Sequence, residues 1–138
     1  MVIDTSAIVA ILFDEPDQRR YGDAIEAATV RLVSAVTRVE LAFVIEGRKR
    51  DAGRERLERF FQLTGAEIVA VTPQQAEIAV DAFRRFGRGR HPASLNIGDC
   101  FSYALARATG EPLLFTGDDF ACTDITPALG EQLEPPAL

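Results

Sequence analysis

Residues 96–120 read NIGDCFSYALARATGEPLLFTGDDF, and this stretch shows how the chain is built. Apolar residues recur at helical spacing from 97 to 108, and Gly110 followed by Pro112 ends the predicted helix. The apolar run over residues 113–115 then predicts a short buried strand. A helix that leads directly into a buried strand is typical of an α/β fold.

The same alternation of strands and helices extends over the rest of the chain. Further strands are expected at residues 2–3, 29–34 and 68–71, with 124–126 as a short fifth strand. The expected helices cover residues 5–13, 16–28, 36–47, 48–63 and 73–86. This order predicts a three-layer α/β/α sandwich around a central, mainly parallel sheet of four to five strands.

Length and composition restrict the class of protein. A chain of 138 residues suits a single domain, expected over residues 1–129, and the tail 130–138 is expected to be disordered. Two cysteines without a CxxC motif and the single His91 argue against the usual zinc sites. The apolar segment 7–13 is much shorter than the roughly 20 residues of a membrane span. The opening also has no basic leader, so we expect a cytoplasmic protein without a membrane partner.

The charge distribution says more about partners than the net charge does. A formal charge of −6 argues against a general nucleic-acid coat, because such binding depends on Lys and Arg. Ten of the fifteen basic residues nevertheless fall between residues 48 and 90. Arg88 and Arg90 are therefore candidate contacts for a phosphate backbone, and a solvated arginine face is the alternative.

Four acidic residues interrupt stretches that otherwise have the composition of a core. They are Asp4, Glu40, Asp99 and Asp118. Removing a carboxylate from water without a partner costs several kcal/mol, and few basic residues lie beside these stretches. Taken singly, each acid is more often a surface residue. Taken together, they indicate a site where carboxylates converge on a divalent cation.

The predicted layout brings these acids toward one edge of the sheet. Asp4 and Asp118 follow predicted strands, whose carboxyl ends border the ligand crevice of open α/β sheets. Glu40 and Asp99 lie in the first turns of helices, where the helix dipole favours negative charge. The sequence therefore predicts a metal site at the carboxyl ends of the strands.

Several segments together resemble the PIN-domain ribonucleases, and specifically the VapC-type toxins of toxin–antitoxin pairs. They are VIDTSAI at 2–8, VTRVELAFVI at 36–45, the stretch 96–120 and TDI at 123–125. The resemblance covers nearly the whole chain and implies a PIN-like fold. It further implies an endoribonuclease that depends on Mg²⁺ or Mn²⁺, is neutralised by a VapB-type antitoxin and forms a homodimer.

The acidic quartet of this family carries over onto the four acids named above. The family spacing of Thr, any residue and Asp selects Asp118 after Thr116, although Asp119 is adjacent. We expect Asp4 and Asp99 to be the principal metal ligands, with the other two acids binding a second ion or orienting water.

Two hydroxyl residues are expected to support the carboxylates. Ser6 and Thr116 are placed to hydrogen-bond them, with a helix cap and a strand-end hydroxyl as the alternative roles. Because the expected nucleophile is a metal-activated water, the products should carry 5′-phosphate and 3′-hydroxyl ends.

The remaining expectations concern partners and alternative functions. The helices expected over residues 36–63 carry more large apolar residues than a short helical hairpin needs for its own packing, namely Phe43, Ile45, Phe60 and Phe61. This excess indicates an exposed docking groove for the antitoxin. Packing between two copies of the chain explains them equally well. A DNA-directed nuclease of related chemistry and a nuclease-derived binding module are the alternative functions.

Overall fold

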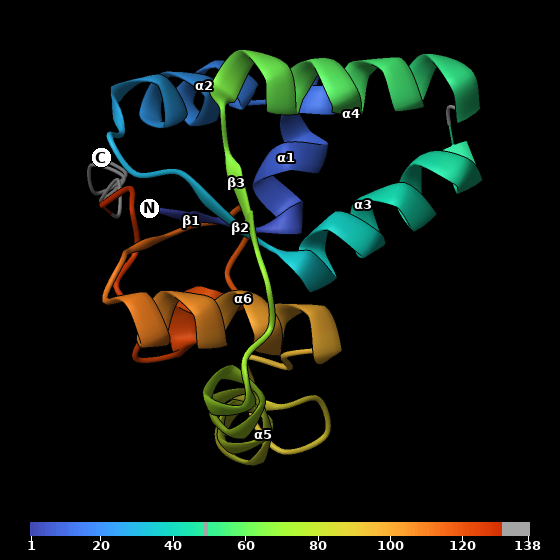
Figure 1. Cartoon of the computed structure of the whole chain (residues 1–138). Coiled ribbons are helices and arrows are strands. Elements are labelled where there is room, and N and C mark those ends of the chain that lie inside the picture. Colours follow the sequence, from blue (N-terminus) through green and yellow to red (C-terminus); the bar gives the residue numbers. More distant parts are fainter. Residues whose placement is uncertain (49, 131–138) are drawn as a thin grey trace, which may run out of the picture.

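The computed structural model of the chain describes residues 1–48 and 50–130, which contain four β-strands and six α-helices (Figure 1). The strands are β1 (Val2–Ile3), β2 (Leu32–Ser34), β3 (Glu67–Val69) and β4 (Leu113–Leu114). The helices are α1 (Thr5–Leu12), α2 (Gln18–Ala27), α3 (Ala35–Arg48), α4 (Arg50–Thr64), α5 (Pro73–Phe86) and α6 (Ile97–Thr109). A 3₁₀ turn, η1, covers Phe120–Cys122. Apart from Gly130, the tail expected to be disordered lies outside the described residues.

The strands form one parallel sheet in the order β3-β2-β1-β4. Val2 of β1 pairs with Leu32 on one side and with Leu113 on the other, so β1 is central. All four strands therefore end at the same edge, where β1 leads into α1 through Asp4. This arrangement confirms the predicted α/β architecture.

The fifth strand expected at residues 124–126 is not formed. Just after this segment, Pro127 forms a single parallel bridge with Leu113. Proline has no N–H to extend the ladder. In addition, the Asp124 carboxylate accepts hydrogen bonds from Tyr103 at 2.6 Å and Arg85 at 2.9 Å, which ties the start of this segment to the helical layer.

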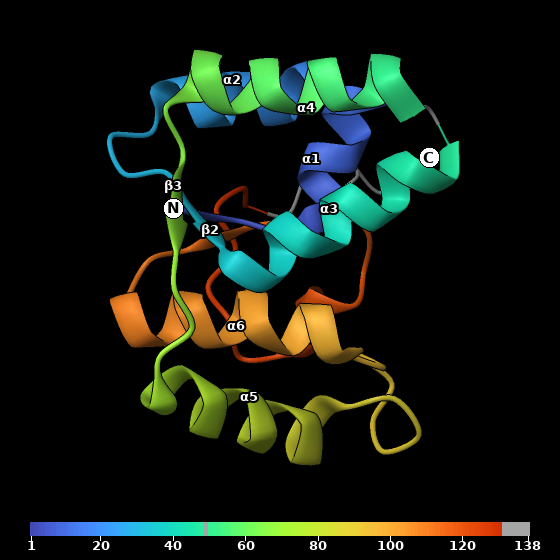
Figure 2. The same cartoon turned by 45° about the vertical axis from the view of Figure 1, so that its right-hand side comes forward.

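Helices cover both faces of the sheet, as Figures 1 and 2 show: α5 and α6 lie on one side and α1 to α4 on the other. Successive residues of a strand point to opposite faces, so Val2 and Leu113 belong to the core under α5 and α6. Ile3 and Leu114 belong to the core under the other four helices. The two-residue strands thus supply both hydrophobic cores.

Local signals explain most of the element ends. Thr72 caps α5 by accepting a hydrogen bond from the Gln75 N–H, and α6 ends at Gly110, which has a positive φ of 73°. Strand β2 begins later than the expected residue 29, because Arg31 binds the carbonyl oxygens of Ala28 at 3.1 Å and Thr64 at 2.6 Å. No helix in the described part of the chain is long and apolar enough to cross a membrane.

Candidate active site

Asp4 is the most deeply buried acid of the site, with 2% of its surface exposed. It caps the N-terminus of α1, and its Oδ2 accepts hydrogen bonds from the Ser6 N–H at 3.0 Å and the Ser6 hydroxyl at 2.7 Å. Its Oδ1 accepts a hydrogen bond from the Ser102 hydroxyl at 2.6 Å. The two oxygens are therefore held from opposite sides, by α1 and by α6.

Ser102 is a site residue that the sequence prediction missed. It is completely buried on α6, and its hydroxyl lies 3.3 Å from that of Thr37, which is equally buried on α3. A signal for its role exists in the sequence, because Ser102 follows Asp99 by three residues and so lies on the same side of the helix. Without such a neighbouring acid, a small polar residue in a buried helix is interpreted as part of the hydrophobic core.

Glu40 projects from α3 toward the start of α6. Its Oε1 accepts a hydrogen bond from the Thr5 hydroxyl at 2.8 Å. A Cβ atom at position 98 would overlap with the Glu40 carboxylate. The carboxylate can therefore lie this close to the backbone of α6 only because residue 98 is glycine. Burial raises the pKa of the Glu40 carboxyl and the charge of Asp4 adds to this, while the Thr5 hydrogen bond acts against it.

Asp99 lies in the first turn of α6 and forms a capping box with Asn96. Its Oδ2 accepts a hydrogen bond from the Asn96 N–H at 3.0 Å. Burial is the main cause that raises the pKa of the Asp99 carboxyl to about 7, opposed by the Asn96 hydrogen bond. The charges of Asp4, Glu40 and Asp119 raise this pKa further. The four carboxylates therefore share one region of negative potential.

The fourth predicted acid, Asp118, lies beside Asp119 in the loop after β4, and both side chains are exposed. The negative charge of Asp119 contributes to the raised pKa of Asp99, and Asp118 borders a pocket next to Arg20 and Tyr21. The assignment of Asp118 therefore stays a prediction from the sequence.

Thr116 takes part in the site through its backbone. Its N–H donates a hydrogen bond of 3.0 Å to the Ser6 hydroxyl, whose own proton goes to Asp4. Within the described residues, the Thr116 hydroxyl makes no hydrogen bond to a carboxylate.

The negative charge of the site has no basic counterpart in the described part of the chain. The salt bridges found there involve none of Asp4, Glu40, Asp99 and Asp119. Within the described residues, no three acids lie close enough together to form a ready-made metal site. Thr5 fixes the Glu40 carboxylate by a hydrogen bond, and the Asn96 N–H fixes the Asp99 carboxylate. The site thus combines mutual repulsion with hydrogen bonds that fix the carboxylates.

The two arginines predicted to bind substrate lie in the segment between α5 and α6. Arg88 and Arg90 are both exposed, and the Arg90 guanidinium lies over the Phe83 ring at 5.6 Å. The nearby Arg85 differs, because it forms a salt bridge with Asp124 at 2.9 Å. Arg88 and Arg90 are thus available at the surface on the side where α6 begins.

The apolar residues expected to form a docking surface divide between core and surface. Ile45 and Phe60 are buried, which corrects the expectation that both are exposed. Ile45 follows the buried Leu41 by four residues, so it faces the same core. Phe43 is 74% exposed on the opposite side of α3, and Phe61 is half-buried.

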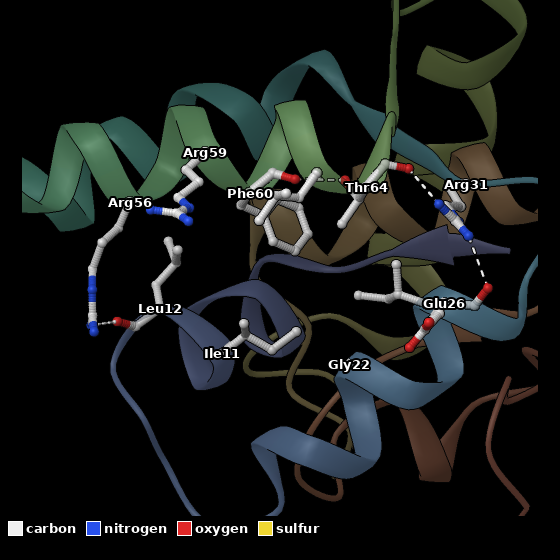
Figure 3. Close-up of a pocket in the computed structure, with 11 residues that line it drawn as sticks. Ile11, Leu12, Gly22, Glu26, Arg31, Arg56, Arg59, Phe60 and Thr64 are labelled. Atoms are coloured by element: carbon white, nitrogen blue, oxygen red, sulfur yellow. Dashed lines mark hydrogen bonds between the residues drawn. The ribbon is translucent and has the colours of Figure 1, made fainter.

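A separate groove opens between α1, α2 and α4 (Figure 3). Its apolar lining consists of Ile11, Leu12, Ile25, Phe60 and Leu63. Leu63 is 73% exposed at its rim. Arg56 and Arg59 of α4 border one end of the groove and Arg31 the other, as Figure 3 shows. Arg56 and Arg31 are held in place by hydrogen bonds to the carbonyl oxygens of Leu12 and Glu26, respectively.

Comparison with known proteins places this chain in a family. The family model of the PIN domain matches residues 1–125. Ribonuclease VapC30 of Mycobacterium tuberculosis is 50% identical over 125 residues, which cover 91% of this chain and 95% of the relative. Ribonuclease VapC of Mycolicibacterium smegmatis is 49% identical over 125 residues, which cover 91% of this chain and 97% of the relative. The chain is thus a PIN-domain protein. Within that class, it belongs to the VapC family of ribonucleases.

Two solved structures share the fold at low sequence identity. One is the sarcin-ricin loop cleaving toxin VapC20 of Mycobacterium tuberculosis, with a TM-score of 0.69 and 15% identity over 91% of this chain and 95% of that one. The other is a toxin–antitoxin complex from Klebsiella pneumoniae, with a TM-score of 0.64 and 20% identity over 89% and 92%. These likenesses confirm the PIN-like α/β/α fold.

Proposed function

We propose that the chain is the toxin of a toxin–antitoxin pair and that its ribonuclease activity requires a divalent cation, Mg²⁺ or Mn²⁺. Asp4, Glu40 and Asp99 would hold it, together with Asp118 or its neighbour Asp119. The observation that carries this proposal is that Asp4, Glu40 and Asp99 lie where β1, α3 and α6 meet, and that none of them forms a salt bridge within the described residues. Burial and neighbouring negative charges also raise the pKa of Asp99. A cation among the four carboxylates would reverse that effect.

The residues present fit such an ion. The site offers carboxylate oxygens, which Mg²⁺ and Mn²⁺ prefer, and it offers no thiolate or imidazole. Gly98 leaves space for the Glu40 carboxylate beside the start of α6, and a side chain there would displace it. A bound divalent cation would stabilise charge on the scissile phosphate and make an attacking water more acidic.

The chain's own groups position the reactants. Asp4 is fixed by hydrogen bonds to both of its oxygens, and Asp99 is held at the N-terminus of α6 by its capping box. Arg88 and Arg90 would hold the RNA backbone beside these acids. Because the attacking group is water, the cut strands should carry 5′-phosphate and 3′-hydroxyl ends.

The groove between α1, α2 and α4 is the proposed docking site of an antitoxin segment. A solved structure with the same fold is a toxin–antitoxin complex, which supports a protein partner. Apolar side chains of the partner would cover Leu63 at the rim of the groove, and acidic side chains would pair with Arg56 and Arg59. The predicted partner is therefore an amphipathic segment with acidic residues beside its apolar face.

A second apolar surface supports the expected homodimer. Large apolar side chains are exposed on three helices around the acids, namely Val39, Phe43, Val80, Phe83 and Ile97. Their exposed fractions range from 40% for Phe83 to 74% for Phe43 and Ile97. We propose that a second copy covers this surface and that the dimer acts on RNA in the cytoplasm.

Cleavage of matched substrates tests this function. The purified protein should cut a single-stranded RNA in Mg²⁺ and lose activity in EDTA, with 5′-phosphate on the downstream fragment. The DNA strand of the same sequence should remain intact. Asp99→Asn should abolish cleavage, while Asp23→Asn, an exposed acid on α2, should not. Cleavage in EDTA, or equal cutting of the DNA strand, would contradict the proposal.

A further inference from the structure

Two hydrogen-bonded chains end on Asp4, one at each carboxylate oxygen. The first runs from the Thr116 N–H through the Ser6 hydroxyl to Oδ2. The second connects Thr37, Ser102 and Oδ1, with distances of 3.3 Å and 2.6 Å. Thr37 and Ser102 are completely buried, so water does not replace either contact.

The direction of the second chain follows from the number of protons available. The Ser102 hydroxyl has a single proton, and it donates this proton to Asp4 Oδ1. The Ser102 oxygen must then be the acceptor in its contact with Thr37. Thr37 therefore donates to Ser102, and Ser102 donates to Asp4. Hydrogen bonds aligned in this way polarise and strengthen one another.

The chain of hydroxyls also joins the three elements that carry the central acids. Ser102 lies three residues after Asp99 on α6, and Thr37 lies three residues before Glu40 on α3. Asp4 itself follows β1. The contact of Thr37 with Ser102 thus connects α3 to α6 through buried polar atoms, close to the acids on both helices.

We propose that Ser102 is a positioning residue, supported by Thr37, that holds Asp4 in the orientation required for binding the divalent cation. The inference rests on the metal-dependent function proposed above and adds residues that act through Asp4. Groups that orient metal ligands usually change metal affinity by about 10-fold to 100-fold when they are lost. Ser102→Ala should therefore weaken Mn²⁺ binding by about 10-fold or more.

Mn²⁺ titration of the metal-free protein by calorimetry, without substrate, measures this effect directly. The matched control is Thr109→Ala, which removes a hydroxyl at the other end of the same helix. This hydroxyl is bonded to the carbonyl oxygens of Leu105 and Ala106 and to the Glu111 N–H, and to no carboxylate. A positioning role predicts weaker Mn²⁺ binding and a smaller Mn²⁺-induced rise in Tm for Ser102→Ala alone. Ser102→Thr keeps the hydroxyl and should regain most of the affinity. A purely structural role would lower the Tm of Ser102→Ala equally with and without Mn²⁺.

A second pair of variants covers the case in which changes at Ser102 prevent folding. Thr37→Val removes the hydroxyl at nearly constant shape and should weaken Mn²⁺ binding, whereas Thr37→Ser should not. Thr37→Val should add little to Ser102→Ala, because Thr37 acts only through Ser102. Wild-type affinity in Ser102→Ala, or in Thr37→Val where Ser102→Ala does not fold, would overturn this inference and leave the proposed function intact. Absence of Mn²⁺ binding by the wild-type protein would overturn both.

Discussion

Replacing Asp99 by Asn should stabilise the metal-free protein at neutral and alkaline pH. The folded protein holds the pKa of Asp99 at about 7, above its ordinary value of 3.8. Between these two pH values the folded state binds more protons than the unfolded state does. The free energy of unfolding therefore falls as the pH rises from about 4 to about 7, and the loss is complete above pH 7.

The size of the effect follows from the same two pKa values. A difference of this size corresponds to about 4 kcal/mol at 1.36 kcal/mol per pKa unit. Because Asp99 is only partly buried, solvent screening reduces the expected contribution to about 1–2 kcal/mol. An asparagine oxygen can still accept the hydrogen bond from the Asn96 N–H, so the substitution keeps the helix cap.

Urea denaturation of wild type and Asp99→Asn in EDTA, at pH 4.5 and pH 8, measures this difference. We expect a gain of about 1–2 kcal/mol for the variant at pH 8 and little gain at pH 4.5. Asp23→Asn serves as the control and should show no such pH dependence. Adding Mg²⁺ should stabilise wild type and Asp23→Asn but not Asp99→Asn. Equal stability of wild type and Asp99→Asn at pH 8 would refute the reasoning, because it would mean that the site imposes no electrostatic penalty on Asp99.

Three further predictions concern the fourth acid, the substrate and the partner. Asp119→Asn should weaken Mn²⁺ binding in calorimetry more than Asp118→Asn does; the reverse order would return the role to Asp118. Replacing Arg88 and Arg90 by Gln should reduce the dependence of RNA affinity on log[salt] by about two phosphate contacts, and an unchanged slope would leave both as solvated surface residues. Leu63→Asp should keep RNA cleavage but abolish rescue of growth by the co-expressed neighbouring antitoxin, and full rescue would exclude the groove.

The local signals of the sequence predicted the order of the elements and several of their ends. Gly110 followed by Pro112 defines the end of α6 by itself, because the left-handed turn at a glycine and the geometry of proline depend only on neighbouring residues. The placement of Asp4 directly after a buried strand was equally local. These features do not depend on which segments later pack together.

Contacts between distant segments could not be predicted in this way. Ser102 and Asp4 are 98 residues apart in the sequence, and their hydrogen bond exists only because α6 packs beside β1. Gly98 offers no sequence signal that Glu40 will lie against it. The expected exposure of Ile45 and Phe60 was wrong because composition does not specify which side of a helix faces a core.

The sequence by itself determined the α/β class and the parallel sheet, and it predicted four acids at the carboxyl edge of that sheet, since the order of elements and the helix caps are encoded in short stretches. Tertiary structure alone decided how these acids are held and which others join them. The loop that follows the turn at Gly117, with a φ of 78°, places the negative charge of Asp119 where it contributes to the raised pKa of Asp99. The physical reason is that burial, hydrogen-bond partners and electrostatic coupling depend on distances between segments, which are set only when the helices pack on both faces of the sheet.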